Sequence, residues 1–158
     1  MNFLEYVLPE YNLKINYPTD WIKLDPELDP INIAFFPPSP KGTPFSIKDT
    51  EGLYIIIMNP STGIMTLEDW VNGNIEDMKL QFPDFTIHES FPRTIPSTNG
   101  RTIPAYQIVY SQSVLKTLLI MALKDEKSYQ FNYTSDREHY ERFYPVIHEM
   151  LSSIEFLV

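Results

Sequence analysis

Three histidines, His88, His139 and His148, are the side chains of this chain best suited to proton transfer or metal binding. His88 falls in a segment with strand character, whereas His139 and His148 lie nine residues apart in a segment with helical character. Nine residues turn a helix by roughly 900°, so these two imidazoles point to opposite faces and cannot share an ion through one face. A metal site that combines His148 with Glu141 or Glu149 stays open, but solvated or partly buried histidines are the favoured interpretation.

A second group of candidate residues is acidic and lies towards the N-terminus. Asp25, Glu27 and Asp29 alternate with prolines in a segment that we expect to be a loop, and Asp20 lies shortly before them. Clustered carboxylates suit either a hard cation such as Ca²⁺ or a basic protein partner. The segment lacks the glycine and the bidentate acid of a calcium loop. The functional interpretation is therefore a docking patch formed by Asp20, Asp25, Glu27 and Asp29, and a solvated acidic turn is the simpler one.

Covalent and phosphoryl-transfer chemistry finds little support in the sequence. The 158 residues contain no cysteine, which removes thiolate nucleophiles, disulfides and cysteine-ligated metals. No Gly-x-Ser-x-Gly motif occurs, and none of the five glycines lies in a phosphate-binding loop. We therefore expect neither an enzyme nor a bound cofactor. The alternative is a small enzyme, or a metal- or ligand-binding protein, that uses a pocket between sheet and helix.

The charge balance restricts the class of partner. The chain has 12 Lys and Arg against 21 Asp and Glu, a net charge of −9, which disfavours nucleic acids and anionic membrane surfaces. The longest apolar run, Leu118 to Leu123, is far shorter than the roughly 20 residues of a membrane-spanning helix, so we expect no direct membrane insertion. The start, Met1 to Glu5, lacks the basic and apolar stretches of a signal peptide, which predicts a cytoplasmic protein if Met1 is the native start.

Residue patterns predict where strands must lie. Alternating or continuous apolar segments bounded by turn residues favour strands. These segments are 13–17, 31–36, 53–58, 85–91, 105–111, 115–124 and 127–134. The short connections late in the chain allow only antiparallel hairpins, and the prolines between residues 37 and 52 predict a surface loop.

Two helices complete the predicted fold. One begins after Thr66, an N-cap residue, and ends before Pro83. The other begins with a capping box over Ser135–Glu138 and continues to Ile154, with a kink or restart at Pro145. We expect a single domain over residues 1–158 with an α+β fold, an antiparallel sheet of about six strands covered by both helices.

The aromatic residues favour a core over a base-stacking surface. Tyr129, Phe131 and Tyr133 share one face of a predicted strand whose other face carries Ser, Gln, Asn and Thr. A nucleic-acid stacking platform would need interleaved Lys and Arg. We therefore expect these aromatics to pack against the second helix, and Trp21 and Trp70 to lie in the core.

Several segments, taken in order, resemble one known family. The matching segments are Tyr11–Trp21 with its Tyr17-Pro18-x-x-Trp21 turn, Thr66–Asp69, Ala105–Tyr110, Lys127–Ser135, and Tyr144-Pro145 with Ser153–Phe156. Their order and spacing over nearly the whole chain resemble the PsbP-like domain family. The sequence departs from the family in its proline-rich loop and in the longer turn at residues 97–104. Within this resemblance Tyr17, Pro18 and Trp21 are structural signature residues.

The resemblance implies an antiparallel sheet sandwiched between helices, and no common catalytic residues. The known relatives are extrinsic subunits or assembly factors of photosystem II, exported proteins of non-photosynthetic microbes, and an import factor that binds the GTPase Ran. It therefore implies a non-catalytic binding or assembly module, and we expect this module to be a monomer. Such a module docks on a larger protein complex, for example a membrane-associated one. The resemblance also implies that the protein is exported or lumenal. A cytosolic chaperone or GTPase-binding factor of the same fold is a further alternative.

Overall fold

The computed structural model describes residues 1–28, 31–38, 51–59 and 66–158. The elements follow in chain order. They are β1 (Phe3–Leu8), the 3₁₀ turn η1 (Pro9–Tyr11), β2 (Leu13–Pro18), β3 (Ile22–Leu28), β4 (Ile31–Phe36), β5 (Gly52–Met58), α1 (Leu67–Gln81), β6 (Thr86–Pro96), β7 (Thr102–Gln112), β8 (Leu115–Lys124), β9 (Lys127–Asp136), α2 (Tyr140–Ser152) and β10 (Glu155–Phe156).

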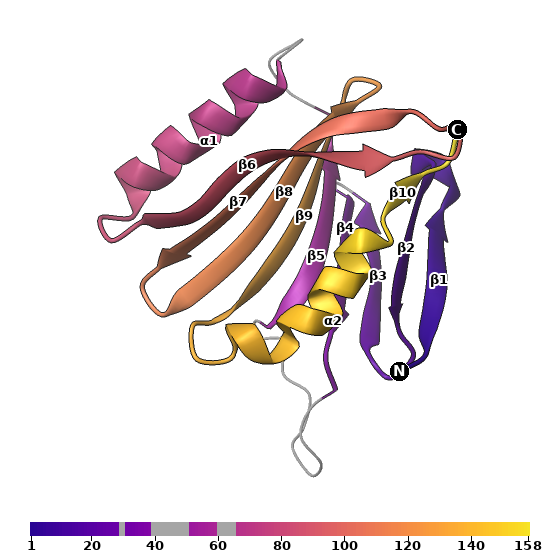
Figure 1. The fold of residues 1–158 in the computed structure, drawn as a ribbon, viewed down its shortest axis with the longest axis horizontal. Coiled ribbons are helices and arrows are strands. Elements are labelled where there is room, and N and C mark those ends of the chain that lie inside the picture. Colours follow the sequence, from indigo (N-terminus) through magenta and orange to yellow (C-terminus); the bar gives the residue numbers. More distant parts are fainter. Residues whose placement is uncertain (29–30, 39–50, 60–65) are drawn as a thin grey trace.

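The described strands form two sheets, where the sequence predicted one sheet of about six strands (Figure 1). The larger sheet has seven strands in the order β3-β4-β5-β9-β8-β7-β6, and the smaller has the order β1-β2-β10. All strand pairs within these sheets are antiparallel, as the short connections predicted. The additional strands β1, β3 and β10 are the reason for the difference, and β3 and β6 are the two edges of the larger sheet.

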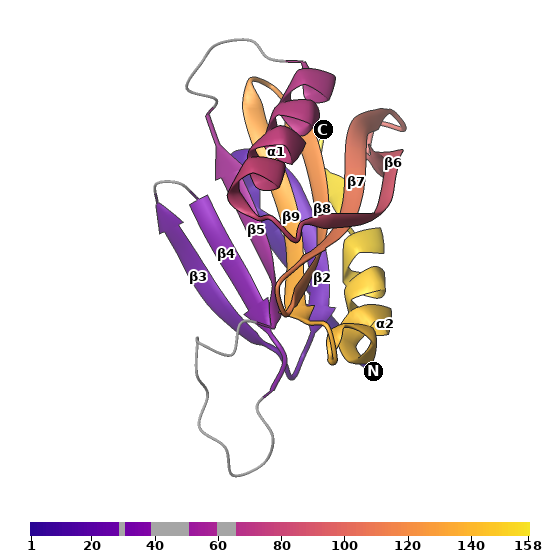
Figure 2. The same cartoon turned by 90° about the vertical axis from the view of Figure 1, so that its left-hand side faces the viewer.

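The two helices cover opposite faces of the larger sheet (Figure 2). On β8, Leu118 and Ile120 pack into the core that contains α2 and the smaller sheet, whereas Leu119 and Met121 pack under α1. Alternate residues of a strand point to opposite faces, so a strand that is apolar at every position needs cover on both sides. The predicted α+β fold with helices on the sheet is confirmed.

Helix α1 begins and ends where the sequence predicted. The side chain of its N-cap, Thr66, accepts a hydrogen bond from the backbone N–H of Asp69 at 3.1 Å. Phe82 follows the last helical residue, and its N–H still bonds to the Met78 carbonyl. The cap and the proline after it are local signals, which is why both boundaries could be read from the sequence.

Helix α2 begins later than predicted, so the predicted capping box is wrong. Ser135 and Asp136 still belong to β9, where they pair with Lys116 and Leu115 of β8. The ladder to β8 satisfies their backbone groups, and the helix starts only at Tyr140 with His139 as its N-cap. A single helix then runs through Pro145 without a restart.

The aromatic core lies where the sequence predicted. Tyr129, Phe131 and Tyr133 are all buried on the face of β9 that carries α2. The Tyr133 hydroxyl donates a hydrogen bond of 2.8 Å to the Tyr140 carbonyl in the first turn of α2, and the two rings lie 4.9 Å apart. Burial raises the pKa of Tyr133 above its usual value, so the hydroxyl keeps its proton and remains a donor.

The signature residues of the N-terminal turn also contact the core. The Trp21 N–H bonds to the Pro18 carbonyl at 3.0 Å, and the Trp21 ring meets Phe143 of α2 edge-on. Tyr17 packs on Phe35 with ring centroids 5.1 Å apart. Trp21 is buried, whereas Trp70 is only half-buried at the edge of the cluster under α1.

No helix in the described part of the chain is both long enough and apolar enough to cross a bilayer.

The contact between Tyr133 and α2 is directly testable. We expect Tyr133→Phe to lower the free energy of unfolding by about 1 kcal/mol, because the variant loses one buried hydrogen bond but keeps the ring. Urea unfolding measures the change. Tyr17→Phe is the matched control, since no hydrogen bond of the Tyr17 hydroxyl is seen within the described residues. Equal losses in the two variants would contradict the role assigned to the hydroxyl.

Candidate functional site

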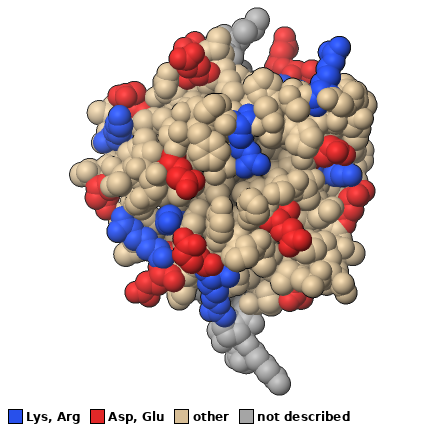
Figure 3. Space-filling model, in the orientation of Figure 1, with Lys and Arg blue, Asp and Glu red and all other residues tan. Residues whose placement is uncertain are grey.

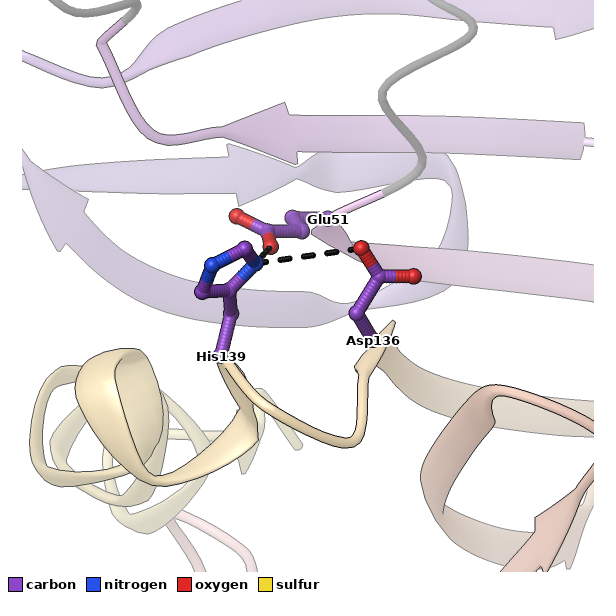
Figure 4. Close-up of side chains that lie close together, drawn as sticks. All are labelled: Glu51, Asp136 and His139. Atoms are coloured by element: carbon purple, nitrogen blue, oxygen red, sulfur yellow. Dashed lines mark ion pairs between the residues drawn. The ribbon is translucent and has the colours of Figure 1, made fainter.

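Three ionisable side chains from separate parts of the chain meet at one end of the larger sheet (Figure 4). Glu51 directly precedes β5, Asp136 is the last residue of β9, and His139 caps α2. The pairing of Gly52 with Thr134 brings Glu51 beside the end of β9. The turn from β9 to α2 then places His139, whose N–H bonds to the Asp136 carbonyl at 3.0 Å.

The geometry of this cluster is that of an ion pair around one imidazole. His139 Nδ1 lies 2.8 Å from Glu51 Oε1 and 3.8 Å from Asp136 Oδ2. All three candidate ligand atoms lie within 4.8 Å of one another. His139 is 46% exposed and Asp136 is 52% exposed, so water can reach the cluster. When the imidazole is protonated, Nδ1–H donates to the Glu51 carboxylate.

The same donors could hold a divalent ion. One imidazole nitrogen and two carboxylate oxygens suit zinc or a similar transition metal, with water completing the coordination. Across the described ranges this is the one group of three such residues with this spacing. The sequence did not reveal it, because Glu51 lies far from the other two in the chain and the helical spacing relates His139 only to His148.

The pair that the sequence left open for a metal, His148 and Glu141, has other neighbours. Glu141 forms an ion pair of 3.7 Å with Lys116 of β8. The His148 ring packs 5.9 Å from the ring of Tyr144. Neither residue belongs to the cluster at Glu51, and their joint role stays a prediction.

His88, which is exposed, contacts a buried serine. It is the extra residue of a bulge in β6, where the register to β7 shifts between Ile87 and Glu89. His88 Nε2 lies 2.8 Å from Ser111 Oγ, which also accepts a hydrogen bond of 2.8 Å from Arg137. An imidazole beside a serine can activate the serine hydroxyl as a nucleophile. Ser111, however, is only 1% exposed. The hydrogen bonds of Ser111 therefore join β6, β7 and the turn after β9. A substrate could not reach the Ser111 hydroxyl.

A groove lies between α1 and the strands β6 and β7. Its volume is about 420 Å³, within the range of pockets that bind small molecules or single side chains. Its lining is mostly apolar and comes from three elements. The lining residues are Leu67, Glu68, Val71 and Asn72 of α1, Pro92, Arg93 and Thr94 of β6, and Pro104, Ala105 and Tyr106 of β7.

The predicted acidic patch lies partly in a strand. Asp20 is exposed in the turn between β2 and β3, but Asp25 and Glu27 belong to β3, so the predicted loop is wrong for these two. The register to β4 shifts between Leu24 and Glu27. An edge strand tolerates an intervening proline at such an irregularity. The side chains of Asp25 and Glu27, and the whole of Asp29, fall outside the described residues, and the docking role of the patch stays a prediction.

The assignment of Ser111 to a structural network can be tested with a reactive probe. We expect a fluorophosphonate to leave Ser111 unlabelled in the folded protein, because the hydroxyl is buried. We also expect Ser111→Ala to lower the free energy of unfolding by about 1 kcal/mol through lost hydrogen bonds. Mass spectrometry of the labelled protein and urea unfolding measure the two effects. Labelling at Ser111 in the folded protein would instead point to a nucleophile.

Comparison with known proteins shows the fold. No protein-family model and no curated protein sequence matches the chain. Cyanobacterial PsbP (CyanoP) from Synechocystis sp. PCC 6803 matches with a TM-score of 0.65 at 16% identity, over 98% of this chain and 92% of its own. PA94 from Pseudomonas aeruginosa, of unknown function, matches with a TM-score of 0.60 at 16% identity, over 97% and 96%. The Ran-binding protein Mog1p from Saccharomyces cerevisiae matches with a TM-score of 0.59 at 10% identity, over 98% and 95%. The chain therefore has the fold shared by PsbP and Mog1p.

Proposed function

We propose that this chain is a non-catalytic protein-binding domain that docks on a larger protein complex. The observation that carries the proposal is the groove between α1 and β6–β7, a preformed apolar recess at the surface. Mog1p, a Ran-binding protein, supports the proposal at the level of the fold.

The groove suits an apolar side chain of a partner. Pro92 and Pro104 stand on adjacent strands and give the recess a rigid wall, because proline fixes its own backbone. The exposed residues Glu68 and Asn72 supply polar groups from α1. A recess that is formed before binding loses little conformational entropy when the partner binds. An anchor side chain in such a recess contributes much of the affinity of an interface.

The partner binds this region through side chains and does not add a strand to the sheet. The edge strand β6 contains Pro92 and Pro96, which have no N–H to donate to a neighbouring strand. Prolines at an edge are one way in which proteins prevent strand addition.

The acidic patch supplies a second contact in this proposal. Asp20 and β3, which carries Asp25 and Glu27, lie at the edge of the sheet opposite β6. The patch and the groove would therefore touch separate parts of a large partner, and the acidic charges would steer a basic surface towards it.

Filling the groove tests the proposal. We expect Asn72→Trp to reduce recovery of the partner in a native pull-down at least about tenfold, because the indole occupies the space of the anchor side chain. Asp77→Trp is the matched control, since Asp77 is exposed on the same helix and does not line the groove. Recovery that is the same with both variants, or no stoichiometric partner with the wild-type protein, would overturn the proposal.

Binding of a divalent cation is a second candidate function, favoured by the cluster of Glu51, Asp136 and His139. The cluster already holds one nitrogen and two oxygen donors near each other. Small side-chain rotations would bring all three to one ion, and such an ion would fix the start of β5 to the start of α2.

Calorimetry with Zn²⁺ tests the second candidate. We expect one site per chain, removal of the ion by a chelator, and affinity lowered by about tenfold or more in Glu51→Gln, which loses a charged ligand. Glu138→Gln is the control, because Glu138 is exposed in the same turn as His139 but lies outside the cluster. Equal weakening by both variants would show non-specific attraction to acidic charge.

A further inference from the structure

Arg93 is a half-buried cation for which the structure shows no carboxylate partner within the described residues. Its Nη1 donates a hydrogen bond of 2.6 Å to Oε1 of the buried Gln107. The chain has 21 acidic residues, so an arginine that is held beside an amide and forms no ion pair with any of the described carboxylates is unusual. A guanidinium has five N–H donors, and within the described residues this one uses a single donor, on Gln107.

The surroundings of Arg93 strengthen its attraction for an anion. Burial lowers the pKa of Arg93, because the charged form has lost part of its hydration. An arginine nevertheless stays protonated at neutral pH. A charge that has already lost hydration binds an incoming anion more strongly than a fully solvated charge does, since less water remains to be displaced.

The side chain faces the side of the sheet that carries α2. Arg93 pairs with Ala105, and Phe91 pairs with Gln107. Directly paired residues of adjacent strands share a face, so Phe91, Arg93 and Gln107 lie on the same face as Ala105, which belongs to the core under α2. Phe91 is 40% exposed there, which is high for a large apolar ring.

Helix α2 contributes aromatic rings to the same face of the sheet. Tyr144 packs against the core under α2, on the face of the sheet to which Arg93 points. It stacks on Tyr140 with ring centroids 5.8 Å apart and packs against His148 at 5.9 Å. Arginine and tyrosine are the side chains that most often dominate binding at protein interfaces.

Charge on the face that carries α2 is mixed in sign. Figure 3 shows acidic and basic groups interspersed over the face that carries α2, without a continuous acidic surface. Glu89 lies on the same face of β6 as Arg93, because it pairs with Val109, and no ion pair joins the two.

We propose that Arg93, Phe91 and Tyr144 form a docking surface for a protein segment in which an Asp or Glu side chain follows an apolar residue. The guanidinium would bind the carboxylate through its free donors, and the exposed Phe91 ring would cover the apolar residue. The inference extends the proposed function to a second face of the domain. It shares with the proposed function only the assumption that the partner is a protein.

Titration of the full chain with a capped dipeptide tests this inference. The probe is acetyl-Leu-Glu-amide, its control is acetyl-Leu-Gln-amide, and NMR follows the backbone amide signals of Phe91 and of residue 93, which every variant keeps. We expect millimolar binding of the Glu probe, no binding of the Gln probe, and at least about tenfold weaker binding in Arg93→Gln. Arg93→Lys keeps the charge but loses the planar guanidinium, which can bind a carboxylate through two N–H groups, so we expect intermediate binding. Arg142→Gln is the matched control, since Arg142 is an exposed cation of α2 that lies over Phe143.

Several outcomes would overturn the inference. These are no shift of the residue 91 and 93 amide signals up to about 10 mM probe, equal binding of the Gln probe, or an Arg93-dependent response to inorganic phosphate without one to the Glu probe. The probe experiment needs no natural partner. Its failure is therefore distinguishable from failure of the pull-down with Asn72→Trp, which tests the groove on the other face.

Discussion

The burial of both faces of β8 is the constraint on which the rest of the structure depends. Leu118 and Ile120 point to one side and Leu119 and Met121 to the other, and all four are almost inaccessible to water. Each such side chain stabilises the fold by about 1.5–3 kcal/mol when it leaves water, so neither face can stay open. One helix on each face is the consequence (Figure 2).

The positions of the candidate sites follow from how these helices reach the sheet. Helix α2 must turn directly out of β9, and this turn places His139 beside Glu51 at the end of the sheet. Helix α1 packs on β7 and β8, while its first turn and the start of β7 leave the groove beside β6. Strand β6 therefore carries surface on both of its faces. The groove lies on one face, and the Arg93 side chain, whose residue borders the groove, points to the other face.

Elements with local signals could be predicted from the sequence. The boundaries of β8 and the start of α1 were read correctly, because alternation, tight turns and an N-cap all lie within a few residues. The misplaced start of α2 and the missed strand β3 have another cause. Ser135 can cap a helix or extend a strand, and only its pairing with Lys116 decides between the two. Strand β3 contains Pro26 and acidic residues, and its pairing with β4 overrides these local signals.

The candidate sites could be predicted from the sequence to a smaller extent than the fold. The contact of Glu51 with His139 depends on the pairing of β5 with β9, and no spacing in the sequence encodes it. Arg93 carries no motif, and its unusual position becomes visible only through Gln107 and Phe91 on the folded sheet.

The central claim is that the groove at α1 holds a side chain of a protein partner. The most direct measurement places a photo-crosslinking amino acid at position 72 in the cells that produce the protein, with position 77 as the reference, and identifies the product by mass spectrometry. The account predicts one dominant crosslinked polypeptide from position 72 and none from position 77. Crosslinks of equal yield from both positions, or a crosslinked small molecule in place of a polypeptide, would contradict it.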